Sequence, residues 1–477
     1  MKNKFINSIY FFLITICTLS CGVNPSTGKK EIILMSENEE KQIGKNEHSK
    51  IIETFGGIYS NVILQNYIES LGDFLVSTSE TPDLKFQFTI LNTPIVNAFA
   101  LPGGYIYLTR GLIVLCQNEA QLAGVIAHEI GHVTARHAAR RYTRNIGTNL
   151  FTNLLGIMTQ NIVISDLINT SASLFLLSYS RHQEYEADEL ATRYMIRAGF
   201  DPNEMGNFLR IMENYSNFQK EILRDKKKVS ELLLTHPTSS KRVDSVIKKS
   251  KDKIPFNPII GREIFLKKID GILFGNKEEE GFFYKNRFIH KSLDFSFQFD
   301  ESFYFLNNPK YLLGVTSGKT KVVFDIDKKI KRTPYEYLSD WGKVEKCSDF
   351  KTNNIKDFKS YSCFIKKNNE VYKLVIIDGE KELYRFALIT NKEEYQNFEN
   401  SFLKITNSFE KVSTNKKLSE TLPPKIKILR FYDDEDFLSK LIDDMNSQAK
   451  FSKSKFFTIN GIKKGEKINF EKVKTIY

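Results

Sequence analysis

The feature that most constrains the fold is the pattern HEIGH, which runs from His128 to His132 within a Pro-free, Ala-rich stretch from Asn118 to Arg141. We predict that this stretch forms one long helix. Residues four positions apart on a helix project from the same face, so both imidazoles could bind one tetrahedral zinc ion. Glu129 would lie about 100° round the helix, beside the ion, where it could act as a general base. The fold must therefore hold this helix against an element that supplies a further ligand.

A catalytic zinc site needs a third protein ligand and an open position for water. In one class of zinc protease, a Gly and a further His ligand follow the second His at fixed positions. This arrangement is excluded here, because those two positions hold Ala135 and Ala138. On one continuous helix, His137 would lie about 180° from His128 and could not share the ion. We interpret His137 as a residue that packs nearby or supports a ligand.

A carboxylate on a later helix is the remaining source of a ligand, and we predict such a helix from Arg181 to Ala198. It carries Glu184 and Asp188 four positions apart on one face. We predict that Glu184 binds the metal and that Asp188 accepts a hydrogen bond from the far nitrogen of a ligating His. Glu186 points about 200° away from Glu184 and is the weaker candidate. A charged, solvated helix face is the alternative interpretation.

The N-terminal residues have the pattern of a secretory signal. A basic start precedes the apolar run from Ile6 to Leu19, which is short for a membrane span, and Ser20 and Cys21 follow. We predict a signal peptide over residues 1–20, lipidation of Cys21 and a tether to residue 35. Thr18 departs from the Leu usual in lipoprotein signals, so a plain signal peptide and an uncleaved anchor are alternatives. A lipidated Cys21 would anchor the mature chain to a membrane.

The chain has 477 residues, which predicts two or three domains, and its hydrophobic fraction of 41% is ordinary for a globular protein. The formal net charge of +12 could suggest nucleic acid as a partner. The Lys residues are spread along the chain among acids, which is typical of a solvated surface. Together with the export signal, this pattern predicts no nucleic-acid partner.

The chain order predicts a helical first domain and a strand-rich second half. We expect helices over 36–53 and 61–77, strands over 86–91 and 105–108, and an apolar helical pair or core segment over 143–178. Period-two alternation over 293–299 and 321–326 predicts an α+β or β-rich domain over 256–412. Residues 413–417 and Pro423-Pro424 read as a linker, and residues 424–477 as strand, helix, strand.

The five cysteines do not form a zinc-ribbon pattern. Cys116 follows an apolar run and is interpreted as a buried thiol. Cys347 and Cys363 lie close in sequence in a chain predicted to be exported, so a disulfide between them is one of two open alternatives.

These motifs together resemble the zinc metallopeptidase family that includes HtpX, BepA and the CAAX prenyl endopeptidases. The resemblance rests on four segments that match in order: residues 24–29, 97–104, 128–132 and 180–188. It covers about residues 24 to 250. It implies a mainly helical, gluzincin-type protease domain over residues 36–255 with a small edge sheet, and one Zn²⁺ per chain. The resemblance carries Glu184 over as third ligand and Asp188 as its neighbouring support.

The resemblance also implies roles for residues outside the two helices. Asn97 and Ala98 are similar to the strand edge that aligns an extended substrate. His236 and Arg242 are similar to later site residues, which would stabilise the oxyanion. Alternatively, His236 would occupy the open position of zinc and keep the enzyme latent.

The tail from 424 to 477 resembles a diverged LysM-type module. The opening Gly-Asp-Thr of such modules is missing, and Tyr432-Asp433-Asp434 stands there instead. We therefore expect a protein-docking or structural role at least as readily as glycan binding.

We expect a zinc endopeptidase of the cell envelope that acts on extended segments of misfolded or misassembled proteins. It would lie on the periplasmic side, lipid-anchored to the outer membrane, with peptidoglycan or envelope assembly proteins as further partners. The alternative is a chaperone or assembly factor with a latent zinc site, which the large C-terminal half favours. An intact Glu129 speaks against a site without catalysis.

Overall fold

The computed structural model describes residues 21–26, 28, 30–144, 178–223, 232, 235, 236, 242, 245, 248, 253–308, 310–329, 331–344, 347–463 and 466–477. The predicted signal peptide and most of the predicted helical pair over 143–178 lie outside these residues. The chain enters the described part through a hairpin of β1 (Cys21–Val23) and β2 (Lys30–Ile32). The predicted lipid on the Cys21 side chain is likewise outside what the structure describes.

The chain divides into two compact units, residues 1–216 with 229–270 and residues 217–228 with 271–477. Both contain helices and sheets, which confirms the α+β class at this coarse level. Among the described residues, no helix combines the length and the apolar character needed to cross a membrane.

The first unit is built on a three-stranded sheet with the order β3-β5-β4. Its strands are β3 (Gln87–Leu91), β4 (Ala98–Leu101) and β5 (Tyr105–Thr109), with β3 parallel and β4 antiparallel to β5. The predicted strands over 86–91 and 105–108 are confirmed. Within the described part of the chain, β4 has a strand partner on one side only, so it is an edge of this sheet.

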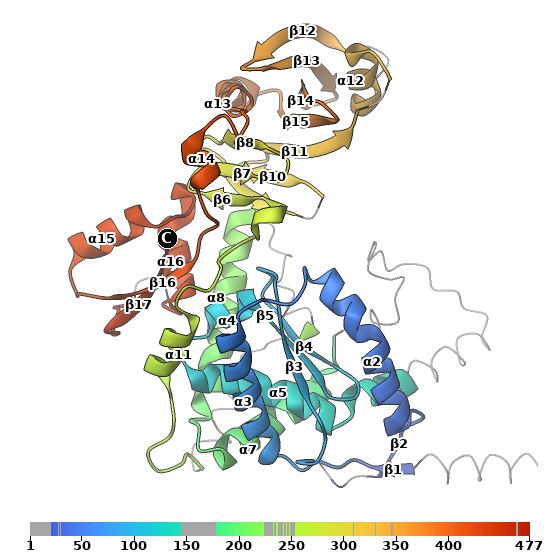
Figure 1. Ribbon diagram of the computed structural model, residues 1–477, viewed down its shortest axis with the longest axis vertical. Coiled ribbons are helices and arrows are strands. Elements are labelled where there is room, and N and C mark those ends of the chain that lie inside the picture. The colour runs from blue at the N-terminus through green and yellow to red at the C-terminus, as the bar shows by residue number, and fades with distance from the viewer. Residues whose placement is uncertain are drawn as a thin grey trace, which may run out of the picture. The chain divides into compact units, whose positions relative to one another are not determined.

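Two capped helices cover opposite faces of this sheet (Figure 1). The helix α2 (Glu37–Thr54) begins with the predicted capping box between Ser36 and Glu39. The helix α3 (Val62–Ser77), with Asn61 as its N-cap, lies where a helix over 61–77 was predicted. On one face, Ile51 of α2 belongs to a cluster with strand residues including Phe99 and Tyr107. On the other, Gly72 lets α3 approach the sheet, because a Cβ there would lie 2.4 Å from the Phe88 ring. The short helix α4 (Arg110–Leu115) follows β5.

The helices α5 (Glu119–Thr134) and α7 (Arg181–Arg197) pack closely against each other beside the sheet. Gly131 permits this approach, since a Cβ there would lie 3.2 Å from the Ala187 carbonyl oxygen. The unit also contains α8 (Asn203–Leu223), up to residue 216, and α11 (Arg262–Ile269).

The prediction of one helix from Asn118 to Arg141 is wrong, because α5 ends at Thr134. Helical backbone resumes over 137–144, after Arg136 with a left-handed φ of 52°. The Arg136 side chain fixes this break, since its Nη2 donates to the Met35 carbonyl at 2.7 Å and its Nε pairs with Glu40 at 3.0 Å. Nothing in the local helix propensity signals these tertiary contacts.

The second unit contains a seven-stranded antiparallel sheet and a three-stranded sheet. Their strands lie between residues 282 and 391, inside the stretch where the alternating pattern predicts strands, whereas the unit itself comprises residues 217–228 and 271–477. In spatial order, the large sheet consists of β12 (Ser348–Ile355), β13 (Phe358–Lys367), β14 (Glu370–Asp378), β15 (Glu382–Asn391), β11 (Lys321–Lys328), β10 (Leu312–Val315) and β9 (Tyr304–Asn307). The small sheet consists of β6 (Phe282–Tyr284), β7 (Arg287–His290) and β8 (Phe295–Gln298). The helices α12 (Pro334–Gly342) and α13 (Tyr395–Asn407) pack on the large sheet.

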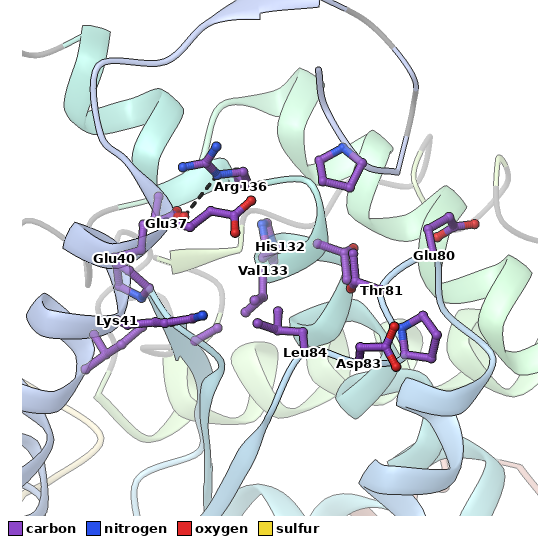
Figure 2. A pocket seen from close by; sticks show the side chains of 18 of the residues that line it. Glu37, Glu40, Lys41, Glu80, Thr81, Asp83, Leu84, His132, Val133 and Arg136 are labelled. Atoms are coloured by element: carbon purple, nitrogen blue, oxygen red, sulfur yellow. Dashed lines mark hydrogen bonds and ion pairs between the residues drawn. The ribbon is translucent and has the colours of Figure 1, made fainter. Parts of the chain in front are cut away.

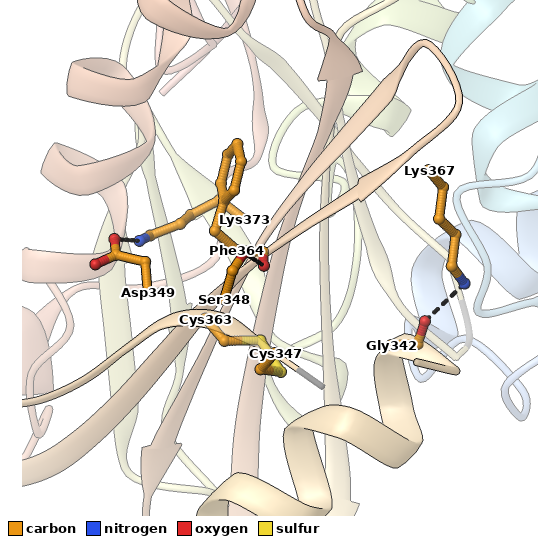
Figure 3. Close-up of a disulfide and its surroundings, with 8 residues drawn as sticks. All are labelled: Gly342, Cys347, Ser348, Asp349, Cys363, Phe364, Lys367 and Lys373. Carbon is orange, nitrogen blue, oxygen red and sulfur yellow. Dashed lines mark hydrogen bonds and ion pairs between the residues drawn. A yellow bond between two sulfur atoms is a disulfide. The ribbon is translucent and has the colours of Figure 1, made fainter. Parts of the chain in front are cut away.

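A disulfide joins Cys347 to Cys363 in this unit (Figure 3). Their Cα atoms lie 5.6 Å apart, within the usual range for the bond. It links the segment that enters β12 to the neighbouring strand β13, which resolves the open alternative in favour of the bond. Cys116 is a buried free thiol, as predicted.

The C-terminal tail forms β16 (Ile426–Arg430), α15 (Glu435–Asp444), the 3-10 turn Ala449–Phe451, α16 (Ser452–Ile459) and β17 (Lys472–Ile476). The two strands pair antiparallel. The helix α16 was not predicted, because an eight-residue helix gives too short a period to recognise. The predicted linker also contains a short helix, α14 (Lys416–Glu420).

Candidate metal centre

Two helix segments position the predicted metal ligands. His128 and His132 lie one turn apart on α5, and Glu184 lies in the first turn of α7. A capping box between Ser180 and Gln183 fixes the start of α7. The Gln183 amide also donates to the His137 carbonyl at 3.1 Å, which ties this first turn to the segment after α5.

The three predicted ligands converge. The Nε2 atoms of His128 and His132 lie 3.0 Å apart, and the Glu184 carboxylate oxygens lie 3.5 Å and 3.6 Å from them. Ligand atoms at about 2.0–2.1 Å from a tetrahedral zinc ion lie about 3.3 Å from one another. The donor set, two imidazoles and one carboxylate, and its spacing therefore fit zinc.

His236 completes a group of four buried side chains whose ligand atoms lie within 4.8 Å of one another. Its Nδ1 lies 3.1 Å from Glu184 Oε1 and 3.3 Å from His128 Nε2. This is the position of a fourth ligand or of a reacting group, so the geometry is compatible with both roles considered for His236.

Glu129 lies beside this group with a side chain that is only 1% exposed. Its Oε1 lies 3.6 Å from His236 Nε2, and its Oε2 has no hydrogen-bond partner within the described ranges. Burial raises the pKa of Glu129 above its ordinary value, against the lowering charges of His236 and His128. A buried carboxylate oxygen without a partner, with a raised pKa, suits a proton acceptor.

Asp188 lies behind His128, on the face where the predicted support would be. Its Oδ1 lies 3.1 Å from His128 Nδ1, on the side of the ring away from the other ligands. Arg242 binds the same carboxylate through Nε at 2.7 Å and Nη2 at 2.6 Å, and its Nη1 lies 2.9 Å from Glu184 Oε2. The guanidinium, 3% exposed, thus bridges the carboxylates of Asp188 and Glu184.

His132 has a different support. Its Nδ1 lies 2.7 Å from His137 Nδ1, and His137 Nε2 lies 2.9 Å from Glu186. Arg140 Nη1 donates to the same Glu186 oxygen at 2.7 Å. His137 therefore supports a ligand, as one of the two predicted alternatives stated, but it does so because the helix breaks before it.

An aromatic ring also holds His132. Tyr179 stacks on the imidazole with ring centroids 3.8 Å apart, and the Arg141 guanidinium lies over the Tyr179 ring, 4.5 Å from its centroid. Tyr179 directly precedes the Ser180 cap of α7, so its place is set by the same local structure that orients Glu184. No periodicity in the sequence marks it.

The charges around the ligands set their protonation in the protein without metal. Burial lowers the pKa of His132 well below its ordinary value, and the charge of His128 adds to this. Burial alone would lower the pKa of His128, but hydrogen bonds to Asp188 and Glu184 outweigh it and raise the pKa to about 9. Burial alone would raise the pKa of Glu184. The charge of His236 and the hydrogen bond to His128 outweigh burial and hold this pKa well below its ordinary value. A metal ion therefore displaces a proton from His128.

The predicted substrate edge lies on β4 and the residue before it. Asn97 and Ala98 are both buried. The backbone of Asn97 bonds with Thr109, and Thr235 Oγ1, next to His236, lies 3.4 Å from Asn97 Oδ1. The structure thus connects this edge to the metal centre through Thr235.

A recess of about 400 Å³ borders His132 on the side of α2 (Figure 2). Figure 2 shows Glu40 and Arg136 paired at one wall, and Thr81, Asp83 and Leu84 at another. The end of β4, at Ala100 and Leu101, also lines it. The recess is mixed in charge and lies along the sheet edge.

Comparison with known proteins assigns a family to this part of the chain. Residues 63–249 match the model of Peptidase family M48. The Beta-barrel assembly-enhancing protease of Escherichia coli K12 is 29% identical over 233 residues, 47% of this chain and 46% of that protein. The Mitochondrial metalloendopeptidase OMA1 of Saccharomyces cerevisiae is 30% identical over 192 residues, 39% of this chain and 54% of that protein.

The chain spans about half of the length of each of these relatives. Among solved structures, cyanobacterial PsbP from Synechocystis sp. PCC 6803 aligns over 27% of this chain and 92% of its own at 10% identity, and its TM-score of 0.22 supports no inference. The helices that carry His128, His132 and Glu184 all fall inside the matched range. The chain therefore carries a domain of Peptidase family M48 over residues 63–249.

Proposed function

We propose that this protein is a zinc-dependent endopeptidase of the cell envelope that hydrolyses peptide bonds in extended segments of misfolded or misassembled proteins. The observation that carries the proposal is the convergence of His128, His132 and Glu184 at spacings that fit one zinc ion. The family match over residues 63–249 supports it. The mainly helical domain with β4 at its sheet edge would be of the gluzincin type.

Zinc held by these three residues would supply a Lewis acid for the scissile carbonyl and for the attacking water. Glu129 would accept a proton from that water and pass it to the leaving amine. Its raised pKa favours the uptake of the proton. Asn97, Ala98 and the edge of β4 would align the substrate as an added strand.

Arg242 takes a positioning role in this proposal rather than a direct catalytic one. Its hydrogen bonds are used by Asp188 and Glu184, so it would hold the two carboxylates in place. His236 remains the candidate for stabilising the oxyanion, because its Nε2 is buried and has no hydrogen-bond partner within the described part.

The direct test compares the parent protein with Glu129→Gln for zinc content and casein cleavage. We expect equal zinc in both and cleavage only in the parent, because Gln cannot accept the proton. Glu189→Gln is the matched control, since Glu189 lies on α7 with a side chain that is 53% exposed. Cleavage by the Glu129 variant at the parental rate would contradict the proposed mechanism.

A second candidate function is a chaperone or assembly factor with a latent zinc site. The position of His236 within the ligand group favours it, because a fourth protein ligand would close the open coordination place. Equal zinc in parent and variant, with no cleavage by either, would support this alternative.

The place of the protein in the cell is part of the same proposal. A signal peptide over 1–20 and lipidation of Cys21 would put it on the periplasmic side of the outer membrane. The disulfide between Cys347 and Cys363 is in keeping with an oxidising compartment. The tail would be a LysM-like module that docks peptidoglycan or envelope assembly proteins, and its order of strand, helices and strand supports this.

A further inference from the structure

The described residues from 24 to 36, which we call the leader segment, lie along the end of α5 and the helical stretch 137–144. Near its start, Asn24 Nδ2 donates to the Ala135 carbonyl at 3.4 Å. Near its end, the Leu34 backbone N–H donates to Thr143 Oγ1 at 2.9 Å. The leader segment is therefore packed on the first unit, although the sequence predicts a tether as far as residue 35.

Asn24 binds where α5 ends. Ala135 is the C-cap of α5, and the left-handed residue Arg136 follows it. Carbonyls at the end of a helix lack donors from the helix itself, and Asn24 Nδ2 supplies a donor to one of them. The Asn24 side chain is 0% exposed, and a backbone N–H two residues later fixes its Oδ1 at 3.0 Å. Asn24 thus helps to hold the break that turns His137 towards His132.

Glu31, on β2, begins a chain of polar contacts that leads to a candidate metal ligand. Its Oε1 lies 2.8 Å from Arg140 Nη2. Arg140 Nη1 donates to Glu186 Oε2 at 2.7 Å, and the same oxygen lies 2.9 Å from His137 Nε2. His137 Nδ1 lies 2.7 Å from His132 Nδ1. An unbroken series of polar contacts thus connects the leader segment to His132.

The chemistry of this chain of contacts decides which nitrogen of His132 is free for the metal. A carboxylate only accepts hydrogen bonds, so Glu186 places the His137 proton on Nε2 and leaves Nδ1 as an acceptor. His132 then donates its Nδ1 proton to His137 and keeps the lone pair of Nε2 for the metal. Arg140 holds Glu186 in this position with one arm of its guanidinium, and Glu31 holds the other arm. The side chains of Glu31 and Arg140 are only 18% and 17% exposed, so water screens this pair less than an exposed one.

We propose that Glu31 is a positioning residue of the metal centre, which acts on His132 through the chain of contacts that begins at Arg140. Asn24 contributes by holding the helix break on which this chain depends. The inference rests on the proposed zinc peptidase function. It extends the parts that this function needs into the leader segment, which precedes the family match over 63–249.

The test measures the zinc affinity of the full-length protein by competition with a chelator at one pH. In Glu31→Lys a second cation faces Arg140 and displaces its guanidinium, so we expect zinc affinity to fall by about tenfold. Glu31→Gln keeps an acceptor but loses the charge, and zinc affinity should fall by about threefold. Glu53→Lys is the matched control, because Glu53 is exposed on α2 and its replacement should leave zinc affinity unchanged.

A double-mutant cycle separates positioning from a general loss of stability. His137→Phe interrupts the chain of contacts between Glu186 and His132, so Glu31→Lys should cause no further fall in zinc affinity in that background. A residue that only stabilises the leader segment would lower zinc affinity by the same factor in both backgrounds. If Glu31→Lys does not fold, Glu31→Gln is compared in the two backgrounds instead.

Parental zinc affinity in both Glu31 variants, or an equal fall with and without His137→Phe, would overturn the inference. Failure of the proposed function has a different signature: the effects of Glu31 on zinc affinity would persist while the parent protein cleaves no casein. Conversely, a parent that cleaves casein and Glu31 variants that bind zinc as tightly as the parent would overturn the inference alone.

Discussion

The two histidines of α5 are held from behind in different ways. His128 meets a carboxylate directly, because Asp188 Oδ1 lies 3.1 Å from its Nδ1 and Arg242 anchors that carboxylate. His132 meets a second imidazole, His137, which in turn contacts Glu186. The first support places a full negative charge next to the ring, whereas the second places that charge one side chain further away.

This difference appears in the pKa values of the two rings. The neighbouring carboxylates raise the pKa of His128 to about 9 in spite of its burial, whereas burial lowers the pKa of His132 well below its usual value. One ligand must therefore release a proton when it binds metal, and the other is already neutral. The comparison teaches that two residues of one motif need not contribute equally to metal affinity.

The largest effect is expected from Asp188→Asn. It leaves Arg242 buried without one of its two carboxylates, which should lower the free energy of unfolding by about 3–5 kcal/mol. It also removes the charged support of His128 and should weaken zinc binding by about 10–100-fold. Urea unfolding and competition with a chelator measure the two effects. Asp73→Asn, at an exposed position, serves as control. An Asp188→Asn protein as stable as the parent would contradict the role assigned to Asp188.

The next effect is a pH dependence of zinc affinity. Below a pKa of about 9 the proton on His128 competes with the metal, so affinity should fall as pH falls, by about tenfold per unit for the release of one proton. Titrations between pH 6 and pH 9, with a chelator whose own protonation is corrected, measure this slope. Asp188→Asn should flatten it, and an unchanged slope in that variant would assign the proton to another group.

A smaller effect is expected from His137→Phe. The ring keeps its packing volume but cannot hydrogen-bond to His132, so zinc affinity should fall by about tenfold. The pH slope should stay as in the parent, because His132 releases no proton. Zinc competition at two pH values distinguishes this result from a general loss of structure, and a flattened slope would contradict the assignment of the two supports.

The smallest effect is expected from Glu186→Gln. The amide still accepts a hydrogen bond from His137 but loses the charge that pairs with Arg140, so zinc affinity should fall by less than about tenfold. The free energy of unfolding should fall by about 1–2 kcal/mol. If Glu186→Gln weakened zinc binding as much as Asp188→Asn, the effect of a supporting charge would not depend on its distance from the ligating His.

The sequence predicted what depends on local spacing. The capping box at Ser36 follows from its local sequence, and the place of His128 and His132 on one helix face follows from helical periodicity. The prediction from sequence was wrong where tertiary contacts override helix propensity. Arg136 breaks the predicted helix through Glu40 and Met35, and this break turns His137 towards His132. Tyr179 has no signature along the chain either, because it reaches His132 from a separate element.

The central claim is that His128, His132 and Glu184 bind one zinc ion. Zinc per chain, measured by mass spectrometry after dialysis against a zinc buffer, tests it most directly when the parent is compared with Glu184→Ala and Glu186→Ala. We predict one zinc per chain in the parent, nearly one in Glu186→Ala, and almost none in Glu184→Ala. Full zinc content in Glu184→Ala, or loss in both variants alike, would contradict the account.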